Sequence, residues 1–196
     1  MMLAFAPVLP LTLTYLQNTL HLGAHWIQLL SCAGIAGNVC GFFFYGKMVK
    51  KMGIRNLEIL IHIAFIIIPL ALMFCRGSLA GVEPIIGTLL FLGNFVYACF
   101  LCAFSQEILA LARPGNATMA SAFANTYMQI GIAVGRSAAS FLLGCGALTA
   151  TWQMWGLEFT DFQTLFMVCA VLALFGLILI FSLPSVIPKH DDYYAP

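Results

Sequence analysis

The sequence predicts an all-α membrane protein, a polytopic bundle of transmembrane helices, and three observations lead to this class. Hydrophobic residues make up 62% of the 196 residues and charged residues only 8%, whereas soluble domains carry about a quarter charged residues. The mean hydropathy is +1.01. Apolar runs of about twenty residues recur along the chain, and each can cross the hydrocarbon layer as a helix. Most of the surface must therefore face lipid.

Three spans are predicted in the first half of the chain. The first is expected at about residues 3–20, where Pro7 and Pro10 interrupt the apolar run. Because no positive residue precedes this run, a kinked span fits it better than a signal peptide does. The second span, about residues 25–45, is rich in small residues. The third, about residues 57–75, lies between a basic segment and a polar break.

Three further spans are predicted in the second half. The fourth, about residues 84–111, begins at Pro84, which the first turn of a helix tolerates. The fifth follows an Arg-Pro-Gly-Asn break at about residues 117–148. A loop with two tryptophans leads to the sixth, about residues 162–183. Residues 1–183 are therefore expected to form one six-helix transmembrane domain, and residues 184–196 a polar cytoplasmic tail.

The distribution of cations orients the predicted spans. Six spans place both termini on one side, and cytoplasmic loops carry an excess of Lys and Arg. Only Arg76 lies in a loop opposite the termini. The N- and C-termini are therefore expected in the cytoplasm, and an integral multi-pass protein of the cell (inner) membrane is predicted. The cations on the side of the termini are Lys47, Lys50, Lys51, Arg55, Arg113 and Lys189.

The basic segment from Tyr45 to Asn56 resembles the loop between the second and third helices of a major facilitator superfamily half. That family of secondary transporters carries Gly-x-Leu-x-Asp-Arg-x-Gly-Arg-Arg/Lys at this place. A proline-bearing first span and a small-residue-rich second span agree with the resemblance, which covers nearly the whole chain as a six-helix pattern. The residues at corresponding positions are Gly46, Met48, Lys50, Lys51, Gly53 and Arg55.

The resemblance implies a mechanical role for this loop, as a gate that latches the second span to its neighbours. Lys50 stands where the family has an acid, which removes a favourable interaction with a helix N-terminus. Glu107 is a possible second acidic partner for Lys51 or Arg55. The alternative interpretation makes the cations solvated anchors of topology.

Family members normally have two six-helix halves, and this chain has one, most like the C-terminal half. The resemblance implies 3+3 inverted repeats, although the sequence shows no repeat between spans one to three and four to six. It also implies a second six-helix half as partner, either another copy in a homodimer or a separate chain. A truncated fragment is the remaining possibility.

A polar stripe marks the fifth span. Its members fall within about a third of the helix circumference. An Arg near the middle of a span costs roughly 2.5–3.5 kcal/mol on insertion scales, so Arg136 should face the bundle interior or a wet cavity. Gly131 and Gly135 form a Gly-x-x-x-Gly pair suited to close helix packing. The stripe comprises Thr118, Ser121, Asn125, Gln129, Arg136 and Ser140.

Two interpretations of Arg136 compete. It either attracts an anionic group of a substrate or of the missing half, or it bonds helix-end carbonyls, Asn125 or Gln129 and only shapes the bundle. The first is preferred because no acid is expected deep in these spans. Other polar residues on the solute pathway are expected to be Tyr15, Gln17, Asn94 and Tyr97, for which interhelical hydrogen bonding is the simpler interpretation.

Composition and motifs exclude several functions. A net charge of +1, without a basic face, gives no sign of nucleic-acid binding. Cys99 and Cys102 have the spacing of a redox or metal half-site but stand alone in a span. His21 and His25 flank Gly23 and lack a third ligand. No metal, cofactor, ATP-binding loop or enzymatic constellation is therefore predicted.

The predicted function is a transporter half that moves a small solute by alternating access with a second half in the lipid bilayer. Arg136 alone favours an anionic solute. Proton coupling usually needs an acid within the membrane, and no well-placed one is expected. The alternative is a non-transporting membrane scaffold or assembly protein.

Overall fold

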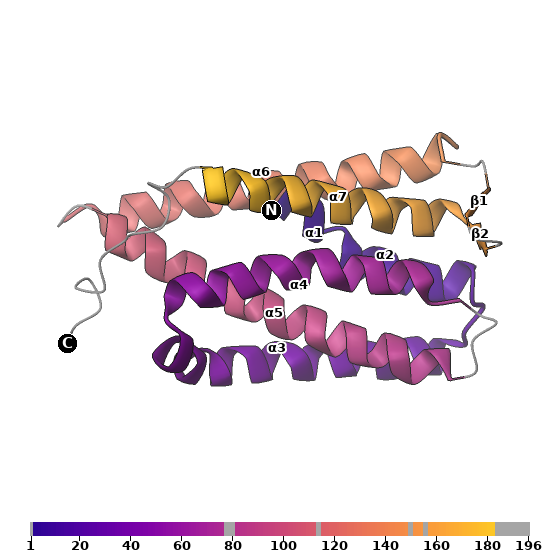
Figure 1. The fold of residues 1–196 in the computed structure, drawn as a ribbon, viewed down its shortest axis with the longest axis horizontal. Coiled ribbons are helices and arrows are strands. Elements are labelled where there is room, and N and C mark those ends of the chain that lie inside the picture. The colour runs from indigo at the N-terminus through magenta and orange to yellow at the C-terminus, as the bar shows by residue number, and fades with distance from the viewer. Residues whose placement is uncertain (1, 77–80, 113–114, 149–150, 155–156, 183–196) are drawn as a thin grey trace.

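A computed structural model describes residues 2–76, 81–112, 115–148, 151–154 and 157–182, which form an elongated bundle of helices (Figure 1). Within this described part of the chain, four helices are long and apolar enough to cross a membrane. The chain is therefore an α-helical membrane protein. These helices are α3 (Ala24–Met52), α4 (Ile54–Phe74), α5 (Val82–Leu111) and α7 (Asp161–Ser182).

The first predicted span is two short helices, α1 (Met2–Phe5) and α2 (Val8–Asn18), and not one kinked helix. The break falls at Pro7, and Pro10 has no N–H to donate to the carbonyl one turn earlier, so the ladder of helical hydrogen bonds is interrupted. Neither helix is long enough to cross a membrane alone.

The fifth helix, α6 (Ala117–Gly144), is long enough to span but is not among the four. α6 is not counted with these four because its polar stripe lowers the mean hydropathy of the helix. It ends four residues before the predicted boundary at 148. The predicted tail, residues 184–196, lies outside the described residues.

The basic segment was expected to be a loop, and most of it is helical. α3 continues through Lys47, Lys50 and Lys51, since lysine and methionine are good helix formers. The turn to α4 is a single residue, Gly53, with φ +77°, a conformation that glycine adopts without steric cost. Asn56 Nδ2 donates to Met52 O at 2.9 Å and satisfies a carbonyl at the end of α3.

A small antiparallel hairpin departs from the all-α prediction. Strand β1 (Trp152–Met154) pairs with β2 (Leu157–Phe159) at the end of the bundle far from the basic turn (Figure 1). Trp152 stacks on Phe159 with ring centroids 4.7 Å apart, and its Nε1 donates to Thr164 Oγ1 at 2.8 Å. These contacts attach the hairpin to the first turn of α7.

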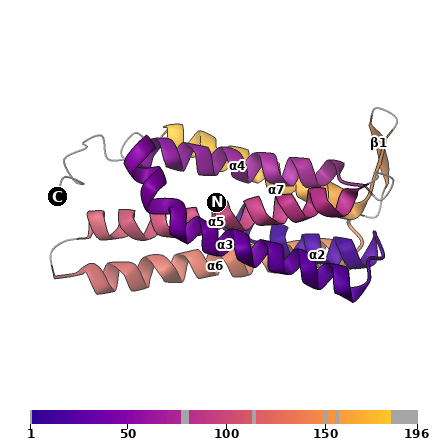
Figure 2. The ribbon, with the colours of Figure 1, turned by 90° about the horizontal axis from the view of Figure 1, so that it is seen from below.

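Glycines allow two pairs of helices to pack closely. α3 lies along α5, where Gly37 and Gly41 meet the backbone of Phe91 and Phe95. α6 packs on α1 in the same manner, with Gly135 against the backbone of Leu3. α4 and α7 form the third main pair and lie side by side (Figure 2).

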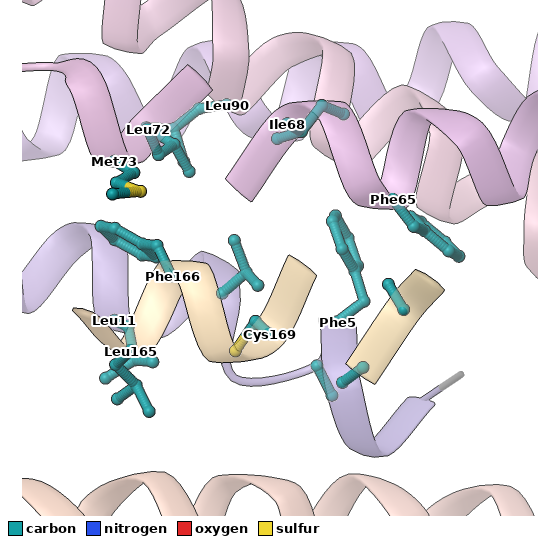
Figure 3. Packing of buried hydrophobic residues seen from close by; sticks show 14 of the residues in the cluster. Phe5, Leu11, Phe65, Ile68, Leu72, Met73, Leu90, Leu165, Phe166 and Cys169 are labelled. Carbon is teal, nitrogen blue, oxygen red and sulfur yellow. The ribbon is translucent and has the colours of Figure 1, made fainter. Parts of the chain in front are cut away.

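The core fills the space between α4, α7 and the two N-terminal helices (Figure 3). Phe5 of α1 stacks on Phe65, midway along α4, with ring centroids 4.1 Å apart. Phe166 of α7 packs edge-on against Tyr15 of α2. These four rings are buried, so α1 and α2 are held by aromatic contacts although each is short.

Gln163 ties α7 to α4 through a buried polar contact. Its side chain is 2% exposed, its Nε2 donates to Met73 O at 2.9 Å, and its Oε1 accepts from Thr160 N at 2.9 Å. The carbonyl of Met73 and the N–H of Thr160 therefore both have a hydrogen-bond partner in the side-chain amide of Gln163. Buried groups left without partners cost about 1–3 kcal/mol each.

Gln163→Leu is therefore expected to lower the free energy of unfolding by about 1–3 kcal/mol. Leucine matches the size of the side chain but leaves Met73 O and Thr160 N without their partners. Reversible detergent unfolding would measure the loss. Gln153→Leu, at an exposed position of β1, is the control and should change stability little. Equal effects of the two substitutions would contradict the assigned role of Gln163.

Candidate functional site

A cavity of about 260 Å³ lies between α2 and α6, beside the break in the N-terminal helices. One cation and two hydroxyl groups face it, and its remaining lining is apolar. No carboxylate lines it, so the cavity has a positive character. Its lining residues are Pro7, Pro10, Leu11, Thr14, Arg136, Ala139, Ser140 and Leu143.

Arg136 is held against the broken helix by one hydrogen bond. Its Nε donates to Ala6 O at 3.4 Å. In an unbroken helix this carbonyl would accept from residue 10, but Pro10 has no N–H. The proline that interrupts the helix therefore also supplies the acceptor that positions the arginine.

Gly135 brings α6 close enough for this contact. A Cβ at this position would lie 3.0 Å from both C and Cα of Leu3 and would press against Leu3 O. Gly131, one turn earlier, makes only ordinary contacts with Met2 and Leu3. The predicted Gly-x-x-x-Gly pair of α6 therefore packs against α1. Because Arg136 directly follows Gly135, this close packing also brings Arg136 near the N-terminal helices.

The geometry suits a small anion. A guanidinium group offers five donors in a planar fork that matches carboxylate and phosphate oxygens. Arg136 is largely exposed, and its contact with Ala6 uses Nε. The hydroxyl of Ser140 is on the same wall, whereas Thr14 Oγ1 donates to Pro10 O at 3.2 Å.

The rest of the polar stripe follows α6 away from this cavity. Asn125 and Gln129 are exposed and do not line it. Arg136 is also largely exposed apart from its contact with Ala6, so the stripe forms an open polar face of the described bundle. A second cavity near it, between α1, α5 and α6, is mostly apolar.

Tyr15 was predicted on the solute pathway, and the structure places it in the core. It is 2% exposed, and its hydroxyl donates to Cys75 O at 2.7 Å. This bond satisfies a carbonyl at the end of α4, so the polar group of Tyr15 has a structural partner. The sequence could not show this, because the two residues are sixty positions apart.

The other predicted pathway residues lie in different places. Gln17 is exposed and lines a cavity between α2 and α3 with Gln28 and Ser31. Asn94 lies where α5 meets α3, and its Nδ2 donates to Leu90 O at 2.9 Å. Tyr97 is half-buried on α5. None of them lines the cavity that holds Arg136.

The residues of the basic turn are exposed. Gly46, Lys50, Lys51, Gly53 and Arg55 all face outward on the described bundle. Glu107, which was expected to pair with Lys51 or Arg55, is half-buried on α5, whereas both cations are exposed.

Glu58 is the polar residue that sequence reasoning missed. It lies one turn inside α4 and is only 9% exposed. It lies near the basic-turn end of the helix, so the expectation that no acid lies deep in these spans stays a prediction. The sequence did carry a signal, because Glu58 is the second residue of the predicted third span, about residues 57–75.

Among the described residues, no group of three His, Cys, Asp or Glu side chains could hold a metal ion.

Comparison with known proteins does not identify a family for this chain. No family model, curated protein or solved structure matches the chain. Function must therefore be inferred from the helices and from the residues around Arg136.

Proposed function

We propose that this chain is one half of a secondary transporter of the major facilitator type, which moves a small solute by alternating access with a second half. The open polar face of α6 carries the proposal. Asn125, Gln129 and Arg136 are exposed on the described bundle, and an arginine is costly in hydrocarbon. A water-filled path shared with a second six-helix half would hydrate this face.

The pairing of helices supports two inverted three-helix repeats. If spans one to three correspond to spans four to six, a contact between the second and fourth spans requires one between the fifth and first. These are the α3–α5 and α6–α1 contacts, and both depend on glycines near the middle of the helix. The contact between α4 and α7 joins the third span to the sixth, so exchanging the two repeats gives the same contact again. Transporter halves of this type have such symmetry.

The remaining contacts follow the same rule. α4 touches α5, and its counterpart is the contact of α7 with α1 and α2. α2 touches α3 as α5 touches α6, and α3 touches α4 as α6 touches α7. This correspondence supports a six-span fold in which α1 with α2 and α6 complete the four apolar helices.

We place the basic turn in the cytoplasm and the chain in the cell (inner) membrane. Lys47, Lys50, Lys51 and Arg55 gather at one end of the bundle, in keeping with the positive-inside rule. Arg76 is at the opposite end with the hairpin, where its guanidinium lies 4.8 Å above the Phe159 ring.

Native mass spectrometry of the chain purified in a mild detergent tests the proposal. The expected particle holds two copies of the 21.3 kDa chain, or one copy with a partner of similar size. The same particle in proteoliposomes should exchange small solutes, which a counterflow assay would detect. A strictly monomeric particle without flux would reject a working transporter half. A stable complex without flux would favour a scaffold or assembly protein.

A further inference from the structure

Exposed aromatic rings are followed by lysines at the basic-turn end of α3. Residues four apart lie on the same side of a helix. Phe43 is 74% exposed, and Lys47 and Lys51 follow it at this spacing. Phe42 is 51% exposed, and Lys50 follows it after two such steps. The Nζ of Lys47 lies 6.0 Å from the centroid of the Phe43 ring, so apolar rings and positive charges share this surface.

The spacing of these residues fits the surface of a bilayer. A helix rises about 1.5 Å per residue, so Lys47 begins about 6 Å beyond Phe43 along the helix axis. The polar headgroup layer on each side of the hydrocarbon core is about 5–8 Å thick. With Phe43 at the edge of the hydrocarbon, Lys47 lies among the lipid headgroups, where its stem can follow apolar surface while its charge stays in the polar layer.

A cavity of about 470 Å³ lies between α3 and α5 at this end of the bundle (Figure 1). Gln106 lines it, and the Oε1 of this side chain accepts from Tyr45 OH at 2.8 Å. Within the described residues, the Nε2 of Gln106 has no acceptor. Gly46 lies between Phe42 and Lys50 on the same side of α3, and no atom lies within 4 Å of a Cβ added there, so the approach from the cavity to Lys50 is open. The lining residues are Phe42, Tyr45, Leu101, Cys102, Ser105 and Gln106.

In the described part of the chain, no exposed acid lies beside the basic turn. The cations of the turn are exposed, whereas Glu58 is only 9% exposed and Glu107 is half-buried. The other described acids, Glu83, Glu158 and Asp161, lie at the hairpin end of the bundle. A cluster of Lys and Arg next to a membrane-spanning helix attracts anionic lipids. The charge of the turn therefore fits an anion of the membrane surface.

We propose that the cavity between α3 and α5 binds one anionic phospholipid from the leaflet beside the basic turn. Lys50 and the Nε2 of Gln106 hold its phosphate, and the upper part of an acyl chain lies against Phe42 and Leu101. A phospholipid presents charge to the lysine and apolar surface to the ring, whereas a soluble anion presents only the charge. The site is separate from the cavity at Arg136, and the proposal stands whether or not the chain transports a solute.

Quenching of tryptophan fluorescence by brominated lipids tests the site. The sequence has no tryptophan between Trp26 and Trp152, so Phe42→Trp places a reporter at the cavity and the wild type supplies the background signal. In phosphatidylcholine vesicles, brominated phosphatidylglycerol should quench the reporter at about a fivefold lower mole fraction than brominated phosphatidylcholine, the factor that one surface cation contributes. The wild-type background should show no such preference.

Lys50→Gln should remove the preference, and Lys51→Gln is the matched control. Both lysines are exposed and both variants lose one positive charge, but Lys51 lies on the side of α3 that carries Phe43. Equal effects of the two substitutions would show a diffuse attraction to the charged surface and would overturn the proposal. A reporter without preference would overturn it as well, and so would a preference that inorganic phosphate removes at constant ionic strength.

Native mass spectrometry gives a second measurement that needs no reporter. After incubation with equal amounts of phosphatidylglycerol and phosphatidylcholine in detergent, the wild type should retain one phosphatidylglycerol per chain. Lys50→Gln should lose this lipid, and Lys51→Gln should keep it. A wild type that retains neither lipid, or both equally, would contradict the proposal. This comparison decides even if Phe42→Trp fails to fold.

Discussion

Gly37→Ala in α3 is expected to lower the free energy of unfolding by about 1–3 kcal/mol, the usual cost of overpacking. The new Cβ would lie 2.8 Å from C and 2.9 Å from Cα of Phe91 and would press against Phe91 O. These atoms belong to the backbone of α5 and cannot rotate away. The two helices must separate, which also weakens the contacts at Gly41.

Gly46→Ala in the same helix is the matched control, and its effect should have the opposite sign. No atom lies within 4 Å of a Cβ at this position, and alanine is up to about 1 kcal/mol better than glycine in a helix interior. Unfolding of both variants in one detergent would measure the difference. If Gly37→Ala were as stable as Gly46→Ala, α3 and α5 could not pack as closely as the structure shows.

The long helices could be predicted because apolar length alone determines them. α4 and α5 match the expected spans within a few residues, since each lies between clear polar breaks. The first span was predicted as one kinked helix, and the structure instead has two short helices, α1 and α2. Two prolines three residues apart remove donors from neighbouring turns, and the chain forms two helices.

The basic turn shows another limit of sequence reasoning. The sequence segment looked like a loop because it is charged, yet charge does not stop a helix of lysine and methionine. The residue that ends α3 is Gly53, whose positive φ a sequence does not display. The burial of Glu58 was missed for a related reason, since it depends on how α4 packs against other helices.

The candidate site was only half visible in the sequence. Arg136 attracted notice because a cation in an apolar run is costly. Its acceptor, Ala6 O, is 130 positions away and is available only because Pro10 lacks an N–H. Contacts of this kind depend on the packing of α6 against α1, which local patterns do not encode.

Arg136→Gln is expected to abolish most anion binding while it leaves the bundle folded. A hydrogen bond to a charged group contributes about 1.5–3 kcal/mol, so the loss of one such contact weakens binding roughly 10- to 150-fold. Stability should change little, because the side chain is largely exposed and makes one long hydrogen bond to Ala6 O. Acetate, succinate and inorganic phosphate are suitable probes, and the shift of the thermal midpoint with concentration measures their binding.

Arg55→Gln removes a cation of the same kind from the exposed turn and should leave binding of these anions unchanged. Arg136→Lys keeps the charge but loses the planar fork, so its binding should fall between that of the wild type and of Arg136→Gln. If Arg136→Gln bound the probes as the wild type does, the cavity beside Pro10 would not be an anion site. If Arg136→Gln unfolded instead, the arginine would serve to close the break between α1 and α2.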